Sequence, residues 1–574
     1  MEKFQYNKYL DLKSRYNRIV NVISILRMIV FIAVIISFII GSSNYFFNYL
    51  GFLFIALFIV LIFIHDKYYK LLDYYDKYLM IVNQYKDRIN GKWKKFNDTG
   101  IEFANDLLTD LNIVGNNSLF QYINVCKTVG GRRKLISKLS NHSVNNKNIK
   151  DSQEMILELS NDINFLVDFQ VNINNKVDNN IDFNEGLSYL NKNVGNKYID
   201  LFLGILFSFL CLLFLFLGYL KIISYNYFYV MFIFNFLISY MYSFIYSREF
   251  ISLTFVSSLY GKLYGVYSSI LNRKFNSKKM TQIYSNMQDG YGSIRKLVFI
   301  DNLNNLKNNI LSSFIFNGLF NINIIVMYLY SKFQLSNVNI IKKSIDDIYE
   351  LEAMTSLVGI GIIRDDVCIP SVDEKVVFDV KNIKHPLLDI NKCVGNDFFC
   401  KNGVNIITGS NMGGKTSFIR TIGINLILMN AGTYVCADSF NSSIFEIFTS
   451  ISIKDNIDKG VSTFYEELLR INKAIKYNEG KRIVLVDEIF KGTNYNDRIY
   501  GALNVIKKLN DDRTILFITT HDFELCEVDI NNIFNYYVKE DYEGNNIKFD
   551  YKIRKGKCTS TNAKYLMSKL GIID

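Results

Sequence analysis

The stretch TGSNMGGKTS (residues 408–417) fits the pattern G-x-x-x-x-G-K-[ST] from Gly409 to Thr416 without a mismatch. It follows VNIITG, whose β-branched residues predict a strand, and precedes SFIRTIGINLILMNAG, whose apolar spacing predicts a helix. In that context glycines let backbone N–H groups close on phosphates, Lys415 reaches the β- and γ-phosphate oxygens, and Thr416 holds Mg²⁺. The sequence therefore predicts an ATP-binding loop made of Gly409, Ser410, Asn411, Met412, Gly413, Gly414, Lys415, Thr416 and Ser417.

Two later segments supply the groups that ATP hydrolysis needs. RIVLVDEIF (482–490) is typical of a buried strand that ends in two carboxylates, of which Asp487 suits the metal and Glu488 suits polarisation of the attacking water. RTILFITTH (513–521) delivers His521 to the same edge, where it would sense the γ-phosphate, although a lone histidine is more often structural. The predicted cofactors are ATP and Mg²⁺, with Glu488, Lys415 and His521 as catalytic residues and Thr416 and Asp487 as metal ligands.

Long uncharged apolar runs lie before this region. A helix needs ~20 apolar residues to span a bilayer, so the runs predict two transmembrane hairpins, 24–41 with 46–64 and 200–220 with 226–246. The alternative is that they are buried core helices of a soluble protein. A further uncharged segment, 310–331, contains three asparagines that are unfavourable in lipid, and we expect it to form a buried helix outside the membrane.

Charged residues and cysteines constrain the compartment. Lys and Arg residues lie just before the first hairpin and just after it. Because Lys and Arg stay on the cytoplasmic side, this predicts a multi-pass membrane protein with the N-terminus, residues 65–199 and everything after 247 in the cytoplasm. The net charge of +11 suits nucleic acid or an anionic membrane face and does not choose between them. The eight cysteines contain no C-x-x-C pair, so neither a zinc site nor a disulfide framework is indicated.

The motifs resemble those of the MutS-type mismatch-repair ATPases. TGSNMGGKTSFIR, AGTYVCA, KGVSTFYEEL, VDEIFKGTNYNDR and TTHDFEL occur in that family's order, and YKIRKGKCTSTNAKYLMSKLGI (551–572) is similar to its closing strand and helix. Upstream, SLFQYINVCKTVGGRRKLISKL (118–139) resembles the opening of the family's helical core, with Thr128, Gly131 and Arg132 at pattern positions. DIYELEAMTSL (347–357) resembles the return helix of that core.

The resemblance implies a fold and further roles. It implies a C-terminal α/β P-loop (ABC-like) ATPase domain and an all-α core and lever domain, to which the four transmembrane helices in two hairpins are added. It implies that Ser462 completes the nucleotide site of a partner subunit, and therefore a homodimer, and that Phe399 packs on adenine, with Phe398 as its rival. His385 and Pro386 match the strand-end pair that precedes the family's nucleotide domain.

These arguments divide the chain into six parts. The predicted parts are a basic cytoplasmic N-terminus (1–23), transmembrane hairpin 1 (24–64), a first core part (65–199), transmembrane hairpin 2 (200–246), a second core or lever part (247–360) and the ATPase domain (361–574).

The chain also departs from the family. The N-terminal hairpin leaves no room for the family's mismatch reader with its Phe-x-Glu wedge, and no nuclease module is expected after the ATPase. The preferred function is a membrane-anchored ATPase that opens and closes on double-stranded DNA, which the basic clusters at 132–134 and 273–279 would contact unless they are solvated or face lipid. The alternatives are an ABC-type transport ATPase, against which the missing Leu-Ser-Gly-Gly-Gln signature argues, and a nucleotide-switched membrane anchor for a protein partner.

Overall fold

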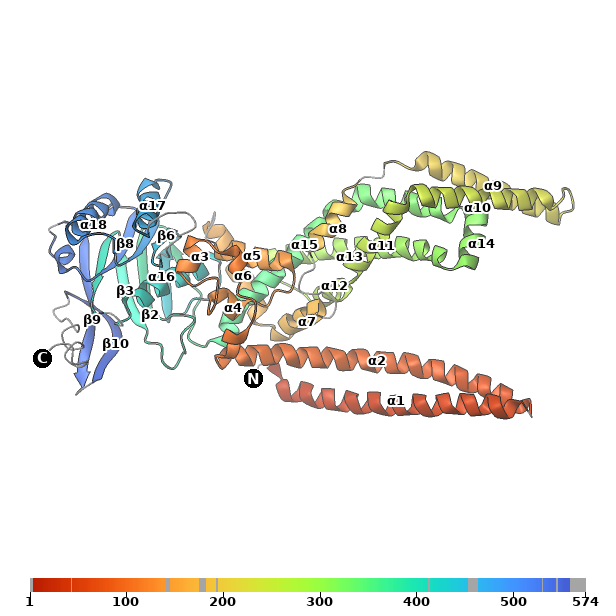
Figure 1. The fold of residues 1–574 in the computed structure, drawn as a ribbon, viewed down its shortest axis with the longest axis horizontal. Helices are drawn as coiled ribbons and strands as arrows, with labels where there is room; N and C mark the ends of the chain where they lie inside the picture. The colour runs from red at the N-terminus through yellow and green to blue at the C-terminus, as the bar shows by residue number, and fades with distance from the viewer. Residues whose placement is uncertain are drawn as a thin grey trace.

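A large helical part is followed by a mixed α/β part. The computed structural model describes residues 4–42, 44–140, 145–174, 182–192, 195–410, 413–452, 463–528, 530–543 and 546–557. Figure 1 shows the α/β part at one end of an elongated molecule and long apolar helices at the other. The predicted Asn411, Met412 and Ser462, and most of the closing segment 551–572, lie outside the described residues.

The helical part contains fifteen described α-helices and three described 3-10 helices. They are α1 (Tyr6–Gly41), α2 (Phe46–Ile89), η2 (Lys92–Lys95), η3 (Ile101–Phe103), α3 (Asp106–Asp110), α4 (Leu119–Ile123), α5 (Val129–Leu139), α6 (Asn146–Ser160), α7 (Ile163–Asn174), α8 (Phe183–Leu190), α9 (Tyr198–Tyr219), α10 (Asn226–Ile245), α11 (Ser247–Gly261), α12 (Tyr264–Leu271), α13 (Lys278–Asn304), η4 (Asn305–Asn308), α14 (Ile310–Phe320) and α15 (Ile322–Ile363).

The described residues of the α/β part form two sheets. Its elements are β1 (Ser371–Asp373), β2 (Val377–Ile383), β3 (Asn396–Lys401), β4 (Gly403–Thr408), α16 (Lys415–Asn430), β5 (Ser439–Ser443), β6 (Glu446–Ser450), α17 (Thr463–Lys476), β7 (Arg482–Asp487), α18 (Tyr495–Leu509), β8 (Thr514–Thr520), η6 (Phe523–Cys526), β9 (Ile533–Glu543) and β10 (Asn546–Lys555). The larger sheet has the strand order β10-β9-β4-β8-β7-β6, and the smaller one has the order β1-β5-β2-β3.

The central strands of the larger sheet are buried on both faces. β4 pairs in parallel with β8 and β9, and β7 pairs in parallel with β6 and β8. Ile407 and Leu485 belong to the same buried cluster as the side chains of α16, whereas Ile406 and Val484 pack with those of α17 and α18. Alternate residues of a strand point to opposite faces, so helices cover both faces and polar groups collect at the strand ends.

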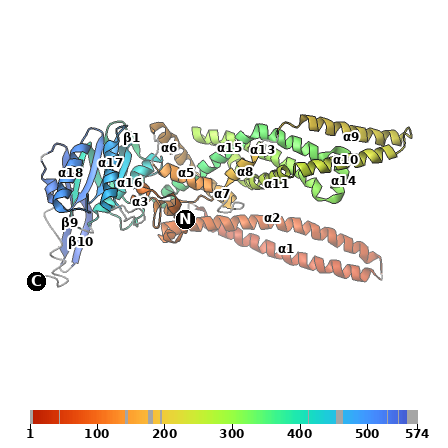
Figure 2. The same ribbon diagram turned by 45° about the horizontal axis from the view of Figure 1, so that its top comes forward.

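Among the described residues, four helices are long and apolar enough to cross a membrane: α1, α2, α9 and α10. Their apolar side chains are largely exposed, as expected of surfaces that face lipid. α1 and α2 continue well past the predicted spans, so the first hairpin is longer than the sequence analysis suggests. Figures 1 and 2 show the α1–α2 hairpin lying apart from α9, α10 and α14, with the two groups pointing the same way.

The segment 310–331 does not form the single buried helix that we predicted. It is broken into α14 and the start of α15, which are bent by 80°, and Ile310 and Leu311 are exposed. The break is at Asn321, which has φ 48° and ψ 47°, a left-handed conformation that asparagine tolerates. Instead of entering the core, α14 packs against α9 and α10. The pair can be a broken span or a re-entrant loop by length and composition.

Asparagine side chains join this broken helix to the second hairpin. The Asn321 amide donates to Gly204 O and Ser208 Oγ, both at 3.3 Å, on α9. On α10, the Asn235 amide donates to Gly318 O at 3.1 Å, and Asn323 donates to a carbonyl of the same helix. These asparagines are buried between helices, so the hydrogen bonds that make them tolerable in an apolar bundle also fix α14 and α15 to α9 and α10.

α15 connects that bundle to the rest of the molecule. Its Glu350 forms ion pairs of 2.7 Å with Lys138 of α5 and Lys279 of α13. Farther along the helix, the carbonyl of Leu357 accepts a hydrogen bond of 3.0 Å from Thr433, which belongs to the α/β part. One continuous helix therefore contacts the apolar bundle, the helical core and the α/β part.

Candidate active site

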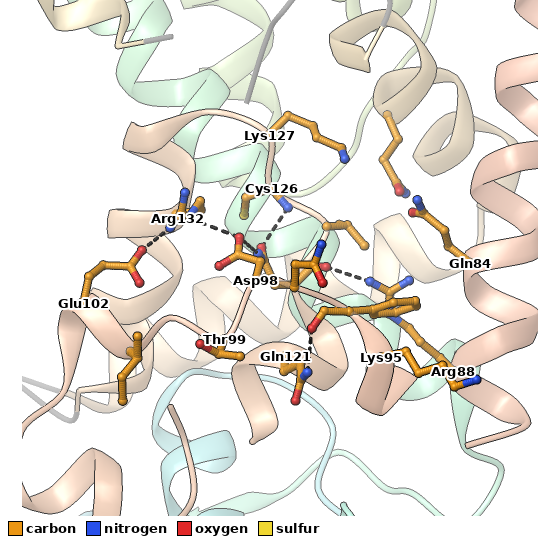
Figure 3. Close-up of a pocket in the computed structure, with 16 residues that line it drawn as sticks. Gln84, Arg88, Lys95, Asp98, Thr99, Glu102, Gln121, Cys126, Lys127 and Arg132 are labelled. Carbon is orange, nitrogen blue, oxygen red and sulfur yellow. Dashed lines mark hydrogen bonds and ion pairs between the residues drawn. The ribbon is translucent and has the colours of Figure 1, made fainter. Parts of the chain in front are cut away.

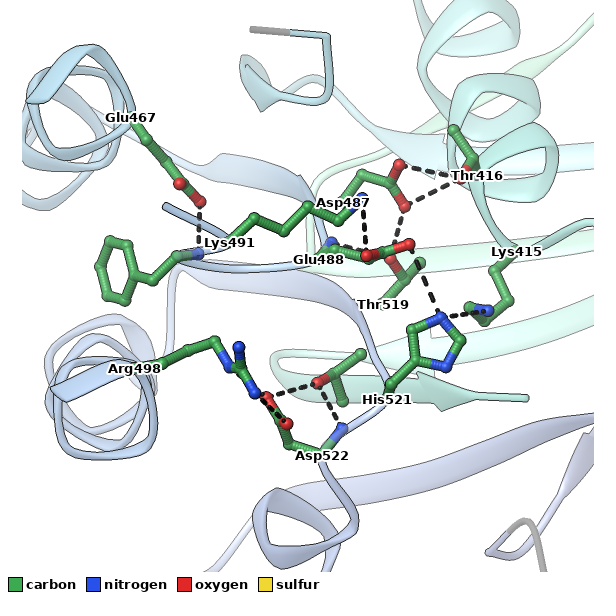
Figure 4. A network of polar contacts seen from close by, with 12 residues as sticks. Lys415, Thr416, Glu467, Asp487, Glu488, Lys491, Arg498, Thr519, His521 and Asp522 are labelled. Carbon is green, nitrogen blue, oxygen red and sulfur yellow. Dashed lines mark hydrogen bonds and ion pairs between the residues drawn. The ribbon is translucent and has the colours of Figure 1, made fainter. Parts of the chain in front are cut away.

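The predicted nucleotide-site residues come together at one edge of the larger sheet. Thr408 is paired with Thr520 across β4 and β8, and Asp487 is paired with Thr519 across β7 and β8. The residues that follow these adjacent parallel strands therefore start from the same edge. This edge is where ligands bind in open parallel sheets, and Figure 4 shows its polar groups converging.

The loop between β4 and α16 adopts a conformation that requires glycine. Gly409 has φ 142° and Gly414 has φ 94°, and Gly414 caps the N-terminus of α16. Lys415 is only 4% exposed, and its ammonium donates to the carbonyls of Gly409 and Ser410 at 2.7 and 2.8 Å. The loop thus surrounds a cationic group and ends at a helix N-terminus, an arrangement that fits phosphate.

The two predicted metal ligands contact each other. The Thr416 hydroxyl lies 2.9 and 2.8 Å from the two carboxylate oxygens of Asp487. Thr519, which the sequence analysis did not assign, donates to Asp487 at 2.5 Å from the neighbouring strand. A hydroxyl and a carboxylate are oxygen ligands of the kind that Mg²⁺ prefers, so these residues fit the predicted metal.

Glu488 is held between Lys491 and His521. Its carboxylate lies 2.6 Å from the Lys491 ammonium and 3.6 Å from His521 Nε2 (Figure 4). The hydrogen bond with His521, followed by the interaction with Lys491, lowers the pKa of Glu488 to about 2 against the effect of burial. Its backbone has φ 51° and donates to the carbonyl of Thr519 at 3.0 Å. Glu488 is therefore ionised, oriented and strained, as residues in functional sites often are.

His521 connects this carboxylate to the loop. Its Nε2 also lies 3.4 Å from the Lys415 ammonium. His521 follows β8, Lys415 starts α16 and Glu488 follows β7, so the three predicted catalytic residues form one contiguous group.

A cavity of about 510 Å³ lies beside the loop. Ser410, Gly414, Lys415, Thr416, Ser417 and Glu488 line one side, and His385 and Tyr551 are also among its lining residues. Burial, followed by the positive charges of Arg420 and Arg364, lowers the pKa of His385 to about 4, so this imidazole is neutral at pH 7.

The structure does not bring Phe399 into this cavity. Phe399 is 53% exposed on β3, and its rival Phe398 is buried, with ring contacts to Phe418 and Phe517. Among the described residues that line the cavity, the large aromatic side chains are those of Phe418 and Tyr551. Tyr551 lies in the quoted segment 551–572, but nothing in the spacing of that segment distinguishes it from neighbouring aromatics.

Glu467 on α17 is another residue that the sequence analysis missed. Its carboxylate accepts a hydrogen bond of 2.6 Å from the backbone N–H of Phe490, two residues after Glu488. Burial raises the pKa of this carboxyl to about 7. The contact ties the helix that follows residue 462 to the loop that carries Glu488.

Comparisons with known proteins agree with this geometry. Residues 405–567 match the family model described as MutS domain V. DNA mismatch repair protein MutS of Finegoldia magna is 31% identical over 245 residues, which cover 41% of this chain and 28% of that protein. Endonuclease MutS2 of Clostridium novyi is 28% identical over 244 residues, covering 42% and 31% of the two chains.

Human DNA mismatch repair protein Msh3 is 33% identical over 178 residues, covering 29% of this chain and 16% of that protein. The chain therefore spans less than a third of the length of these curated relatives. The matched region contains the Gly409–Thr416 loop, Asp487, Glu488 and His521. The C-terminal region of the chain is therefore similar to domain V of MutS proteins.

Proposed function

We propose that the chain is a membrane-anchored ATPase of the MutS type, with a P-loop fold in its C-terminal domain. The observation that carries this proposal is the single group formed by Lys415, Thr416 with Asp487, and Glu488 with His521 at one sheet edge. Mg²⁺ bound with ATP would neutralise phosphate charge, and Thr416 and Asp487 would hold it. Lys415 and the loop amides bind the phosphates. The Lys415 ammonium would exchange its hydrogen bonds to two loop carbonyls for hydrogen bonds to phosphate oxygens.

Glu488 orients the attacking water in this proposal. A carboxylate with a pKa of about 2 is a weak base, so its contribution is to position water and accept its hydrogen bond rather than to remove a proton early. Its contact with Lys491 must open to free one oxygen for that water. His521 would sense the γ-phosphate, because it contacts both Glu488 and Lys415.

We also propose a homodimer in which Ser462 of each subunit completes the other subunit's site, coupled to opening and closing on double-stranded DNA. The names of the relatives, mismatch repair proteins and an endonuclease, support a DNA partner. The predicted basic clusters give only weak support to DNA binding, although they are rich in Lys and Arg. Arg132 pairs with Asp98 and Glu102, and Arg273 pairs with Asp162 and Asp168, so both are engaged within the core.

The membrane placement is part of the proposal. Four exposed apolar helices of sufficient length, and the Lys and Arg residues around the first hairpin, support a multi-pass protein with its core and ATPase domains in the cytoplasm. Both hairpins point away from the α/β part (Figures 1 and 2), which is compatible with insertion of both into one bilayer.

The test is the ATPase rate of the full chain in detergent, with and without perfect or mismatched duplex DNA, across a salt series. Glu488→Gln should lower turnover by at least about a hundredfold while ATP still binds, because the water loses its orienting carboxylate. Glu527→Gln, which changes an exposed carboxylate directly after η6, is the matched control and should leave the rate unchanged. Normal turnover in Glu488→Gln would overturn the assignment.

Stimulation by DNA that fades with salt would support a tethered DNA clamp. A rate that no DNA changes would leave the ATPase in place and remove DNA from the proposal.

A further inference from the structure

A second cavity, of about 680 Å³, lies in the helical part at the end of α2 (Figure 3). Its walls come from the last turns of α2, from residues 95–102, from residues 121–127 and from Arg132 on α5. None of the described residues that line it also lines the cavity beside the loop 409–414. Its volume is in the range of small-molecule sites, about 300–1,000 Å³.

The lining of this cavity carries an excess of positive charge. Arg132 takes up both acidic side chains of the wall, because its guanidinium lies 3.3 Å from Asp98 and also pairs with Glu102. The remaining cationic side chains of the wall form no ion pair with these two carboxylates, although Asp98 attracts Lys127 at longer range; they are Arg88, Lys95 and Lys127.

Arg88 is a buried cation whose hydrogen bonds are incomplete. It is 4% exposed, and it donates through Nε to Tyr122 O at 2.8 Å and through Nη2 to Asn124 O at 2.7 Å. Its Nη1 has no hydrogen-bond partner among the described residues. Its guanidinium also lies 4.8 Å from the ring centre of Phe96, another lining residue. A buried guanidinium with an unused N–H donor is unfavourable unless an anion accepts a hydrogen bond from that donor.

Lys127 adds a second cation to the same wall. Figure 3 shows its side chain extending across the cavity toward the side that carries Gln84. Burial, followed by repulsion from Arg88, lowers the pKa of this ammonium, although Glu352 and Asp98 act in the opposite direction. An anion placed between them would relieve that repulsion.

We propose that this cavity binds a small, soluble, phosphate-bearing anion. The lining has four cationic side chains and two carboxylates, and this excess suits a ligand with more than one negative charge. A phosphate ester carries about −1.5 to −2 at pH 7. Arginine and lysine together are the side chains that recognise phosphate, the first through its planar fork and the second as a point charge.

A lipid headgroup is excluded by distance. At ~1.5 Å per residue, Arg88 lies about 36 Å along α2 from Ile64, the last residue of the predicted span. In the proposed membrane placement, the cavity therefore opens in the cytoplasm, away from the bilayer surface.

The ligand would bind beside residues 122–127, the segment that connects α2 to α15. Tyr122 and Asn124 accept hydrogen bonds from Arg88 of α2. From the same short segment, Val125 donates to Ser356 at 3.1 Å and Lys127 donates through its backbone to Glu352 at 2.7 Å, both on α15. Binding would therefore fix the end of the first hairpin against the helix that reaches the α/β part.

The experiment is equilibrium binding of radiolabelled inorganic pyrophosphate to the full chain in detergent. The Lys415→Ala background removes most binding at the nucleotide loop, so the second site is measured by itself. We expect saturable binding of about one pyrophosphate per chain, weakened about tenfold by Lys127→Gln and by Lys95→Gln, because each loses a charge-assisted contact. Lys92→Gln, an exposed lysine of the same segment that does not line the cavity, should leave the affinity unchanged.

Lys95 is exposed, so Lys95→Gln does not endanger folding. Absence of saturable binding, or binding that Lys127→Gln and Lys95→Gln leave unchanged, would overturn the proposal. Because the ATPase of the otherwise unaltered chain is measured separately, failure here leaves the proposed ATPase function standing.

Discussion

α2 and α15 are helices of similar length, 44 and 42 residues, that both run from the apolar end of the molecule to its core, yet they are packed differently. Apart from Gly51, the buried residues of α2 lie between Leu72 and Arg88, in its last turns. Those of α15 extend from Asn323 to Ile363, along nearly the whole helix. α2 is thus anchored at one end, whereas α15 is held throughout.

The contacts of the two helices at the apolar end also differ in kind. α2 meets α1 mainly through aromatic rings, such as Phe31 with Phe58 at 5.8 Å. Two polar contacts are added, the Asn48 amide with Gly41 O at 3.2 Å and Ser24 Oγ with His65 Nε2 at 3.1 Å. α15 begins at a bend whose asparagines bond to α9 and α10. At this end α2 is therefore held mostly by ring packing, whereas α15 is held by directional hydrogen bonds to two other helices.

The largest effect that would sharpen this comparison is a pH effect at the core end of α15. Burial raises the pKa of Glu352 to about 7, despite hydrogen bonds from Thr128 and Lys127 that favour the anion. A raised carboxyl pKa adds stability that is fully present below the unfolded pKa, near 4.5, and is lost as pH rises through about 7. From pH 5 to pH 8 the protein should lose roughly 2–3 kcal/mol through this group.

The measurement is the unfolding midpoint in detergent at both pH values for the wild type and for Glu352→Gln. The substitution should remove most of the difference between the two pH values. An equal difference between the two pH values in both proteins would mean that groups other than Glu352 cause the pH dependence of stability.

The next prediction compares the asparagine at the start of α15 with an asparagine at the apolar end of α2. Asn321→Leu loses two hydrogen bonds to α9 and places a branched side chain at φ 48°, which together should cost about 2 kcal/mol. Asn48→Leu, the matched change on α2, should cost less than about 1 kcal/mol. Thermal unfolding of the purified full-length variants checks both values. Equal losses would show that the two hairpins are held alike and would break the comparison.

The smallest effect concerns helix glycines. A Cβ at Gly318 of α14 would lie 2.4 Å from the ring of Phe232, which is itself packed 4.9 Å from Phe314. A Cβ at Gly51 of α2 would lie 3.0 Å from the ring of Phe38, which is exposed and can move. Gly318→Ala should therefore destabilise by about 1 kcal/mol or more, and Gly51→Ala by little or nothing.

The same thermal-unfolding assay in detergent compares the two alanine variants with the wild type. A larger loss for Gly51→Ala than for Gly318→Ala would contradict the tighter packing of the second bundle.

Much of the candidate site was predictable because its parts are local in sequence. The glycines, Lys415 and Thr416 occupy one loop, and Asp487 and Glu488 end one strand pattern, so spacing alone assigns them a role. The four apolar helices were predictable for the same reason, since hydrophobicity over ~20 residues is a local property. The bend at Asn321 was not, because asparagines that are costly in lipid become tolerable once other helices supply partners.

The sequence by itself determined which residues form the phosphate loop, which carboxylates end its neighbouring strand, and which helices are apolar enough to face lipid. Only the tertiary structure decided that Lys491 and His521 hold Glu488, that Tyr551 rather than Phe399 lines the cavity, and that Arg88 and Lys127 face one pocket. The reason is physical: these contacts join residues far apart in the chain, and they depend on strand order, register and helix packing, which no local pattern encodes.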